Sequence, residues 1–196
     1  LTADVVVTSS KEFRQTIEPG YVGQVNFVSL ADGSTWSGNL LIEWIVAADP
    51  TENTSPKASI EVSFVCQNPT CFGTPGVGEY TQHRFAYKSS DDLGSDQQGF
   101  VQCDPSVSGD EFVCRKSISV SASDNVMFMR VRPFLRKTTV KVTGGATLPV
   151  QTYDVTSTAS TPLGITRRVQ VTRTELPQLP ASFDYVLLSE QSDISK

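Results

Sequence analysis

The sequence predicts an all-β protein, an antiparallel β-sandwich or jelly-roll-like domain of about a dozen short strands. Short runs that alternate apolar and polar residues recur along the chain, separated by clusters of turn-forming residues. The 196 residues include 13 Gly and 11 Pro, and only 19% are charged. The sequence shows no internal repeat, no segment with a clear helical pattern and no linker long enough to divide domains. We therefore expect residues 1–196 to form a single domain.

The first half of the chain carries the clearest strand pattern. Residues 38–47 place Leu40, Ile42 and Trp44 on one face, which is typical of an internal strand. Residues 9–17 could begin with a capping box at Ser9 and Glu12, but an irregular strand is the preferred interpretation. The other strands expected here cover residues 3–8, 22–30, 60–66, 80–88 and 99–103.

The second half continues in the same way. Pro133 is expected to end one strand, because proline removes a backbone donor. The last run, 183–189, is apolar on both faces and is expected to lie in the core. The remaining strands expected here cover residues 111–121, 126–132, 136–143, 148–158 and 163–173.

The four cysteines fall into two close pairs. Four residues separate Cys66 from Cys71, and ten separate Cys103 from Cys114. Zinc sites favour repeated short spacings or histidine partners, and the chain has only one histidine. Disulfides Cys66–Cys71 and Cys103–Cys114 are therefore favoured over a metal site. They imply an oxidising compartment and export to the extracellular space or cell surface.

Charge is distributed unevenly. Residues 1–110 hold 5 Lys and Arg against 14 Asp and Glu, whereas residues 111–196 hold 11 against 7. The net charge of −5 argues against a nucleic-acid partner. The uneven charge suits contacts between copies of the chain, although a solvated face of two strands is the favoured interpretation of the basic residues. The candidates for contacts between copies are Arg130, Arg132, Arg136, Arg167 and Arg168.

No local motif predicts catalysis, a cofactor or a metal. His83 is the only histidine, and nothing near it resembles a nucleophile with its base, so it is expected to be packed and hydrogen-bonded. Glu43 and Glu61 would need to face one cleft to act as a glycosidase pair. An acidic loop lacks the complete pattern of a calcium loop, which leaves weak calcium binding or simple solvation open. Its carboxylates are Asp91, Asp92 and Asp96.

The C-terminal 70 residues resemble the globular heads of minor type IV pilins and pseudopilin-like proteins. The resemblance rests on the ordered runs FMRVRP, LPVQTYDVTS, RRVQVTR, LPQLP and FDY, between Phe128 and Tyr185. Such proteins begin with a leader, a glycine cleavage site and a long apolar helix with an early glutamate. The sequence that starts at Leu1 contains none of these, so the resemblance implies a soluble head whose helix would precede Leu1.

The resemblance implies a non-enzymatic, exported filament subunit that contacts other pilin-like subunits through that helix, with adhesion to a surface glycan or protein as an additional role. The isolated domain is expected to be monomeric, because exposed ion pairs contribute only about 0–1 kcal/mol each. The alternative is a secreted carbohydrate- or surface-binding β-sandwich module, for which an exposed aromatic platform including Trp36 would be evidence.

Overall fold

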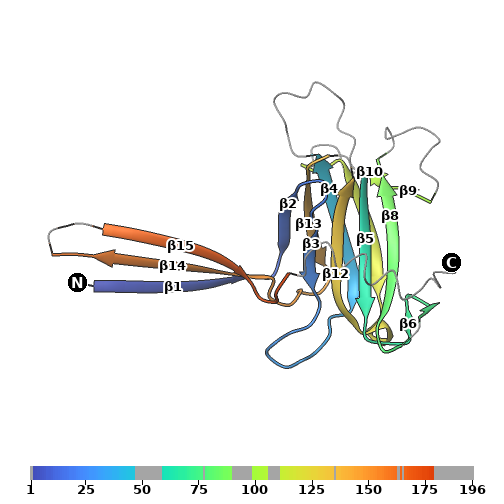
Figure 1. Cartoon of the computed structure of the whole chain (residues 1–196), viewed down its shortest axis with the longest axis horizontal. Helices are drawn as coiled ribbons and strands as arrows, with labels where there is room; N and C mark the ends of the chain where they lie inside the picture. The colour runs from blue at the N-terminus through green and yellow to red at the C-terminus, as the bar shows by residue number, and fades with distance from the viewer. Residues whose placement is uncertain are drawn as a thin grey trace, which may run out of the picture.

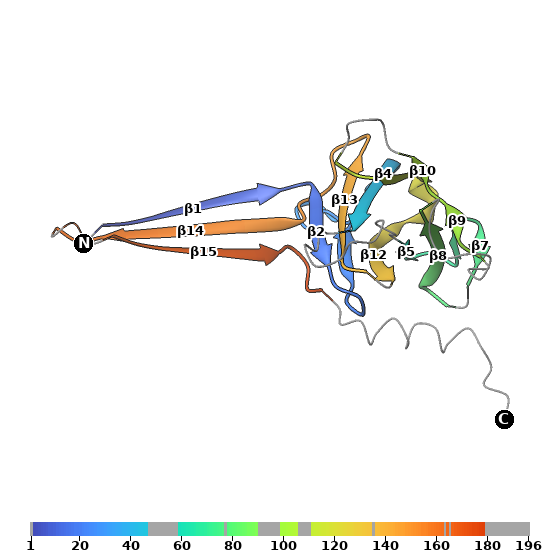
Figure 2. The same cartoon turned by 90° about the horizontal axis from the view of Figure 1, so that it is seen from above.

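Most of the described strands form a β-sandwich of two sheets, and a three-stranded arm projects from one edge of the sandwich (Figures 1 and 2). The computed structural model describes residues 2–46, 59–76, 78–89, 99–105, 111–134, 136–162, 164 and 166–178. The terminal strand expected at 183–189 and the acidic loop with Asp91, Asp92 and Asp96 lie outside these residues.

One sheet of the sandwich has the strand order β10-β11-β4-β13-β2, with every pair antiparallel. Its edge strand β2 lies next to the arm (Figure 2). The strands of this sheet are β2 (Phe13–Ile17), β4 (Gly38–Val46), β10 (Asp104–Pro105), β11 (Cys114–Val120) and β13 (Thr138–Gly144).

The second sheet has the order β3-β12-β5-β8-β9. All its pairs are antiparallel except the short parallel pairing of β8 with β9. Its strands are β3 (Gly23–Asn26), β5 (Ser59–Cys66), β8 (Thr81–Lys88), β9 (Val101–Gln102) and β12 (Val126–Phe134). A small hairpin, β6 (Thr70–Cys71) with β7 (Thr74–Pro75), and one 3-10 turn, η1 (Ala122–Asp124), complete the sandwich.

The core lies between the two sheets, where the predicted alternation places apolar side chains face to face. The Trp44 ring on β4 packs 6.0 Å from the Tyr87 ring on β8. The rings of Phe27 and Phe64 are separated by 6.3 Å. Trp44, Phe27 and Phe64 are fully buried, so the strand faces predicted from the sequence do form a packed interior.

Both predicted disulfides are confirmed. Cys66–Cys71 joins β5 to β6, with 5.6 Å between the Cα atoms. Cys103–Cys114 ties the start of β11 to the segment between β9 and β10, with a Cα separation of 5.5 Å. The pair fits an oxidising environment, as expected from the sequence.

Proline does not end β12, contrary to the sequence-based expectation. Pro133 pairs with Ile60 of β5, and β12 runs on to Phe134. The register of β3 on the other side of β12 covers only Phe128 to Val131. Pro133 therefore lies where β12 has no second neighbour among the described strands, so its missing N–H leaves no gap in a described ladder.

The arm is a single layer of three antiparallel strands in the order β1-β14-β15. β1 (Thr2–Ser10) runs from the far end of the arm towards the sandwich, and β14 (Thr152–Ser160) and β15 (Thr166–Thr174) form a hairpin beside it (Figure 1). The sequence predicted these strands but not that they leave the sandwich. The expected single sandwich is thus a sandwich with an appended sheet.

Candidate functional site

The arm exposes an apolar face that no other described element covers. Cross-strand neighbours in an antiparallel sheet point to the same side. The register aligns Val7 with Val155 and Val171 in one row, and Val5 with Val169 in the next row, across Ser157. We call these five valines the valine face. Val5, Val7, Val169 and Val171 keep 63%, 59%, 60% and 54% of their surface exposed.

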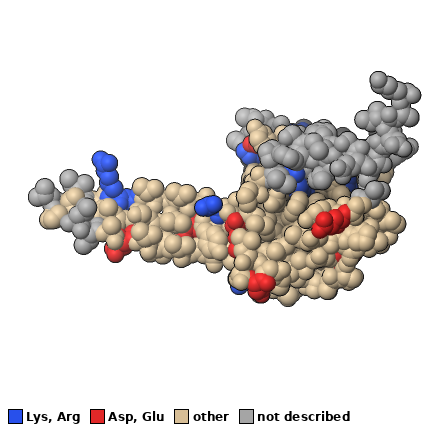
Figure 3. Space-filling model, turned by 60° about the horizontal axis from the view of Figure 1, so that its bottom comes forward, with Lys and Arg blue, Asp and Glu red and all other residues tan. Residues whose placement is uncertain are grey.

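The opposite side of the arm is hydroxyl-rich, and we call it the polar face. Its rows include Thr8 with Asp154 and Thr172, and Val6 with Thr156 and Gln170. The Thr172 hydroxyl donates a hydrogen bond to the Asp154 carboxylate. In the view of Figure 3 the arm is a narrow projection with few charged side chains.

Gln151 fastens the arm to the sandwich. Its buried side-chain amide accepts a hydrogen bond from the Asn26 N–H at 2.9 Å and donates one to the Asn26 carbonyl, also at 2.9 Å. Its backbone N–H donates to the Ser10 carbonyl, and its carbonyl accepts from the Glu175 N–H. Gln151 therefore hydrogen-bonds to the free edge of β3 at Asn26 and to the ends of β1 and β15 that lie nearest the sandwich.

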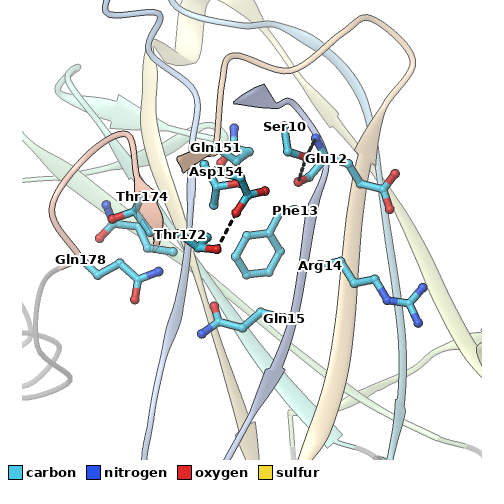
Figure 4. A pocket seen from close by; sticks show the side chains of 12 residues that line it. Ser10, Glu12, Phe13, Arg14, Gln15, Gln151, Asp154, Thr172, Thr174 and Gln178 are labelled. Carbon is cyan, nitrogen blue, oxygen red and sulfur yellow. Dashed lines mark hydrogen bonds between the residues drawn. The ribbon is translucent and has the colours of Figure 1, made fainter. Parts of the chain in front are cut away.

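A groove of about 450 Å³ opens at this root, between the polar face of the arm and the edge of the sandwich (Figure 4). Amide, hydroxyl and carboxylate side chains dominate its wall, with Phe13 as the one aromatic ring among the described lining residues. Such a wall can hydrogen-bond a polar ligand. The groove is lined by Ser10, Glu12, Phe13, Arg14, Gln15, Gln24, Gln151, Thr152, Asp154, Thr172, Thr174 and Gln178.

The arginine of this groove is already engaged with protein groups. The two terminal guanidinium nitrogens of Arg14, Nη1 and Nη2, donate to the Glu111 carboxylate, and the guanidinium lies 5.5 Å from the centre of the Phe112 ring. The hydrogen bonds and opposite charge of this exposed pair raise the pKa of Arg14 and lower the pKa of Glu111. Figure 4 shows Arg14 directed away from most other lining side chains.

A second groove, of about 470 Å³, continues the valine face towards the sandwich. Leu30, Val150 and Tyr153 line it, together with Arg173 and Glu175. The Tyr153 hydroxyl donates to the Glu175 carboxylate at 3.3 Å. Partial burial, and then the neighbouring negative charge, raise the pKa of Tyr153. The apolar surface of the arm therefore ends in a partly polar hollow at its root.

His83 is packed and hydrogen-bonded, as expected from its aromatic strand. Its ring contacts Phe85 at 4.5 Å and Phe72 at 5.7 Å, centre to centre. Nδ1 lies 2.8 Å from the Thr74 hydroxyl. Burial lowers the pKa of His83, while the negative charge of Asp124 opposes this with a smaller effect.

Glu43 and Glu61 cannot act as a pair on one substrate. Glu43 is on β4 and has Lys141 3.9 Å away, whereas Glu61 is on β5 and has Arg84 at 3.6 Å. Their sequence neighbours Ile42 and Ile60 are fully buried in the core, so both carboxylates point to the outer faces of opposite sheets. Packed sheets are about 10 Å apart, which exceeds the separation of a retaining pair before side-chain length is added.

The five candidate arginines do not form one surface. Arg130 is only 2% exposed, so this buried side chain does not fit a role in contacts between copies. Arg132 stacks over the Phe134 ring at 5.5 Å on the sandwich. Arg167 and Arg168 are exposed on β15 of the arm, far from the other three (Figure 1). Four of the five lie on strands, and Arg136 lies in the bend between β12 and β13, so their positions in the sequence did not show which of them share a surface.

Trp36 does not form an exposed platform. It is 8% exposed, packs on Phe27 at 5.5 Å between ring centres, and donates its indole N–H to the Ala146 carbonyl at 3.2 Å. The exposed aromatic side chains on the described surface are Tyr21 and Tyr80, at 68% and 52%. Trp36 therefore does not supply the exposed aromatic platform that would have been evidence for the alternative binding module.

Two general searches of the described residues returned nothing. No group of three or more His, Cys, Asp or Glu side chains is arranged to hold a metal ion. Within the same residues, no helix has the length and apolar character needed to cross a membrane.

Comparison with known proteins identifies no relative. No protein-family model matches the chain, and searches of curated sequences and of solved structures return no match either.

Proposed function

We propose that this chain is the exported head of a filament subunit of the type IV pilus or pseudopilus kind. The observation that carries the proposal is the valine face of the arm. Soluble monomers rarely expose contiguous apolar surface without a partner, and a small sheet gains much of its stability by packing its apolar face. In a filament, neighbouring subunits would cover this face.

Two further features support a place at the cell surface. The disulfides Cys66–Cys71 and Cys103–Cys114 suit an exported protein. The C-terminal resemblance to minor pilin heads includes most of β12, β14 and β15. Assembly would then run through an apolar helix encoded upstream of Leu1, with the head setting the position of its neighbours.

We propose a structural rather than a catalytic role. The support is the chemistry of the two grooves, whose described walls contain no Cys, His or Lys side chain. Their hydroxyl–carboxylate contacts, Thr172 with Asp154 and Tyr153 with Glu175, are explained as hydrogen bonds that join neighbouring strands of the arm at its root. A filament subunit needs shape and contact surfaces, which the sandwich and the arm provide. Adhesion would be an additional property of the same exposed head.

A second candidate function is binding of a surface glycan in the groove at the arm root. Amide and carboxylate side chains such as Gln15, Gln178 and Asp154 are suited to hydrogen-bond sugar hydroxyls. Screening the protein against a glycan array, with Gln15→Ala and Thr139→Ala as test and control variants, addresses this candidate. Loss of a signal with the first variant alone would support the glycan site.

The coding sequence immediately upstream of Leu1 tests the filament proposal. We expect a prepilin cleavage site followed by a long apolar helix with an early glutamate. Expressing that full-length protein in a piliated bacterium should place it in surface filaments, detected by immunogold labelling. A cleaved secretory signal joined directly to Leu1, with no apolar helix, would contradict the filament role and favour the binding module.

A further inference from the structure

The arm has two outer strands, and their free edges differ in charge. The order β1-β14-β15 leaves one side of β1 and one side of β15 without a strand partner among the described residues. β15 carries Arg167, Arg168 and Arg173, whereas β1 carries Asp4 alone. Charged side chains on an edge strand oppose pairing with another chain, so β15 is protected and β1 is not.

The sequence of β1 suits it to pairing. Its nine residues contain no Pro, Gly, Lys or Arg. Val5, Val6 and Val7 follow one another and stay 63%, 56% and 59% exposed. β-Branched residues favour extended backbone, and a long apolar edge offers a row of unpaired N–H and C=O groups to an added strand.

We propose that β1 pairs antiparallel with β1 of a second copy of this chain, about a two-fold axis at Val6. This register uses all nine residues. It sets Val6 opposite Val6 of the second copy, Val5 opposite Val7, and Asp4 opposite Thr8, so that no like charges face each other.

Antiparallel pairing of β15 with β15 of a second copy would instead bring like charges together. Full pairing of β15 with itself centres on Gln170 and sets Arg167 of each copy opposite Arg173 of the other. Two like-charged pairs would then lie across one strand boundary, which destabilises a sheet. The charge pattern therefore selects β1 as the self-complementary edge.

The product is a continuous six-stranded sheet with a β15 edge at each side. The two sandwiches lie at opposite ends, because β1 runs towards its own sandwich and the strands pair antiparallel (Figure 2). The valine faces of both arms join on one side of the sheet. This inference goes beyond the filament proposal and does not depend on it, since it rests only on the geometry and charge of the arm.

Cysteine trapping tests the register. All four native cysteines are in disulfides, so Val6→Cys adds a single thiol. We expect Val6→Cys to form a covalent dimer under mild oxidation, because paired Cα atoms lie about 4.5–5.5 Å apart. Asp4→Cys and Thr8→Cys should each give little dimer alone, since like positions are about 13 Å apart. Mixing these two variants should give the heterodimer.

Sedimentation tests the interface without cross-linking. In place of the monomer expected from the sequence, which considered ion pairs alone, we expect the unmodified chain to form a dimer with rising concentration. The dimer should persist at 0.5 M salt, because backbone hydrogen bonds and apolar contacts are not screened as ion pairs are. Val6→Lys sets two cations face to face and should weaken the dimer at least 10-fold in 0.1 M salt. Gln170→Lys, in the same cross-strand row but on the β15 edge, should leave it unchanged.

Circular dichroism and disulfide mapping establish that each variant is folded. A chain that stays monomeric at all concentrations and gives no Val6→Cys dimer would overturn the proposal. Equal trapping by Asp4→Cys alone, or equal weakening by Gln170→Lys, would also overturn it. A photo-cross-linking residue at position 6 should react with β1 of another copy, and reaction with the sandwich or with residues 179–196 would identify another occupant.

Discussion

The sandwich and the arm are built from the same kind of strand but differ in what covers them. Trp44, Val62 and Phe64 in the sandwich are fully buried, whereas Val169 on the arm keeps 60% of its surface exposed. In the sandwich, two sheets supply each other with an apolar neighbour. In the arm, no second sheet of the described residues packs on either face. The comparison shows that alternation forms the strand, while a second layer supplies most of its hydrophobic stability.

The two regions should therefore differ in how they unfold. The sandwich has one continuous core and two disulfides, so it should open as a unit. The arm is held at its root by Gln151 and by its own ladder of hydrogen bonds. Its amides should exchange with solvent through local opening at lower free energy than those of β4 or β5.

The largest expected effect comes from the core. Trp44→Ala should lower the free energy of unfolding by about 3–5 kcal/mol, because it removes a fully buried ring that packs on Tyr87. Val169→Ala on the arm is the matched control and should change it by less than about 0.5 kcal/mol. Urea unfolding measures the free energy of unfolding of each variant. Circular dichroism follows both variants, and tryptophan fluorescence also follows Val169→Ala. Equal effects would mean that the arm is part of the cooperative core.

Removal of the disulfide that closes the longer loop, Cys103–Cys114, should have the next largest effect on stability. Cys103→Ser with Cys114→Ser should cost about 3 kcal/mol, and Cys66→Ser with Cys71→Ser about 2 kcal/mol, because the longer loop restricts the unfolded chain more. Thermal melts of both double variants test the order. Hydrogen exchange should stay unchanged in β14 and β15, and accelerated exchange in the arm would contradict the separation of the two regions.

Breaking the root of the arm should have an intermediate effect. Gln151→Ala leaves the buried N–H and C=O of Asn26 without this amide and should cost about 1–3 kcal/mol. We also expect faster exchange throughout β1 and β14, since their anchor is lost. Gln170→Ala, on an exposed arm position, serves as the control. Unchanged arm protection in Gln151→Ala would show that the strand ladder alone fixes the arm.

The smallest effect is a pH dependence confined to the sandwich. Burial holds the pKa of His83 below its ordinary value of 6.5, so the unfolded chain binds this proton more readily than the folded chain. The contribution is complete above about pH 6.5 and is lost as pH falls towards the lower folded pKa. Because His83 is partly exposed, the loss should be small. His83→Gln should remove it, and a histidine proton resonance titrating at or above pH 6.5 would contradict the assignment.

Local pattern predicted most strands and both disulfides. The run 38–47 is apolar on both faces of a strand, so β4 (Gly38–Val46) could be placed from sequence as an internal strand, and the close cysteine spacings made their pairing the simplest choice. The prediction that Pro133 ends its strand was wrong, and Trp36 is not the exposed side chain that the binding-module alternative would need, because both outcomes depend on neighbouring segments. Pro133 is tolerated where β3 has already ended, and Trp36 is covered by Phe27 and by the chain near Ala146. Arg130 was offered for contacts between copies, yet it lies inside the sandwich.

The sequence predicted only part of the valine face. Valines alternating with threonines and arginines in residues 166–174 predicted a strand with an apolar side. One signal of the arm was present, because all three of its strands combine few large apolar residues with many Ser and Thr. The register of the arm, its face of five valines and the hydrogen bonds of Gln151 all depend on residues that are far apart in the sequence, such as Val5 and Val169.

The sequence by itself determined the class of this protein, its strands and its cysteine pairs, because a two-residue period and short-range covalent spacing are local properties. Only the tertiary structure decided which apolar faces are buried. A two-residue repeat in the sequence shows that one side of a strand is apolar. It does not show whether another sheet, solvent or a second copy of the chain lies against that side. That difference separates β4 in the core from β1 on the arm, since Leu40 is fully buried while Val5 remains 63% exposed.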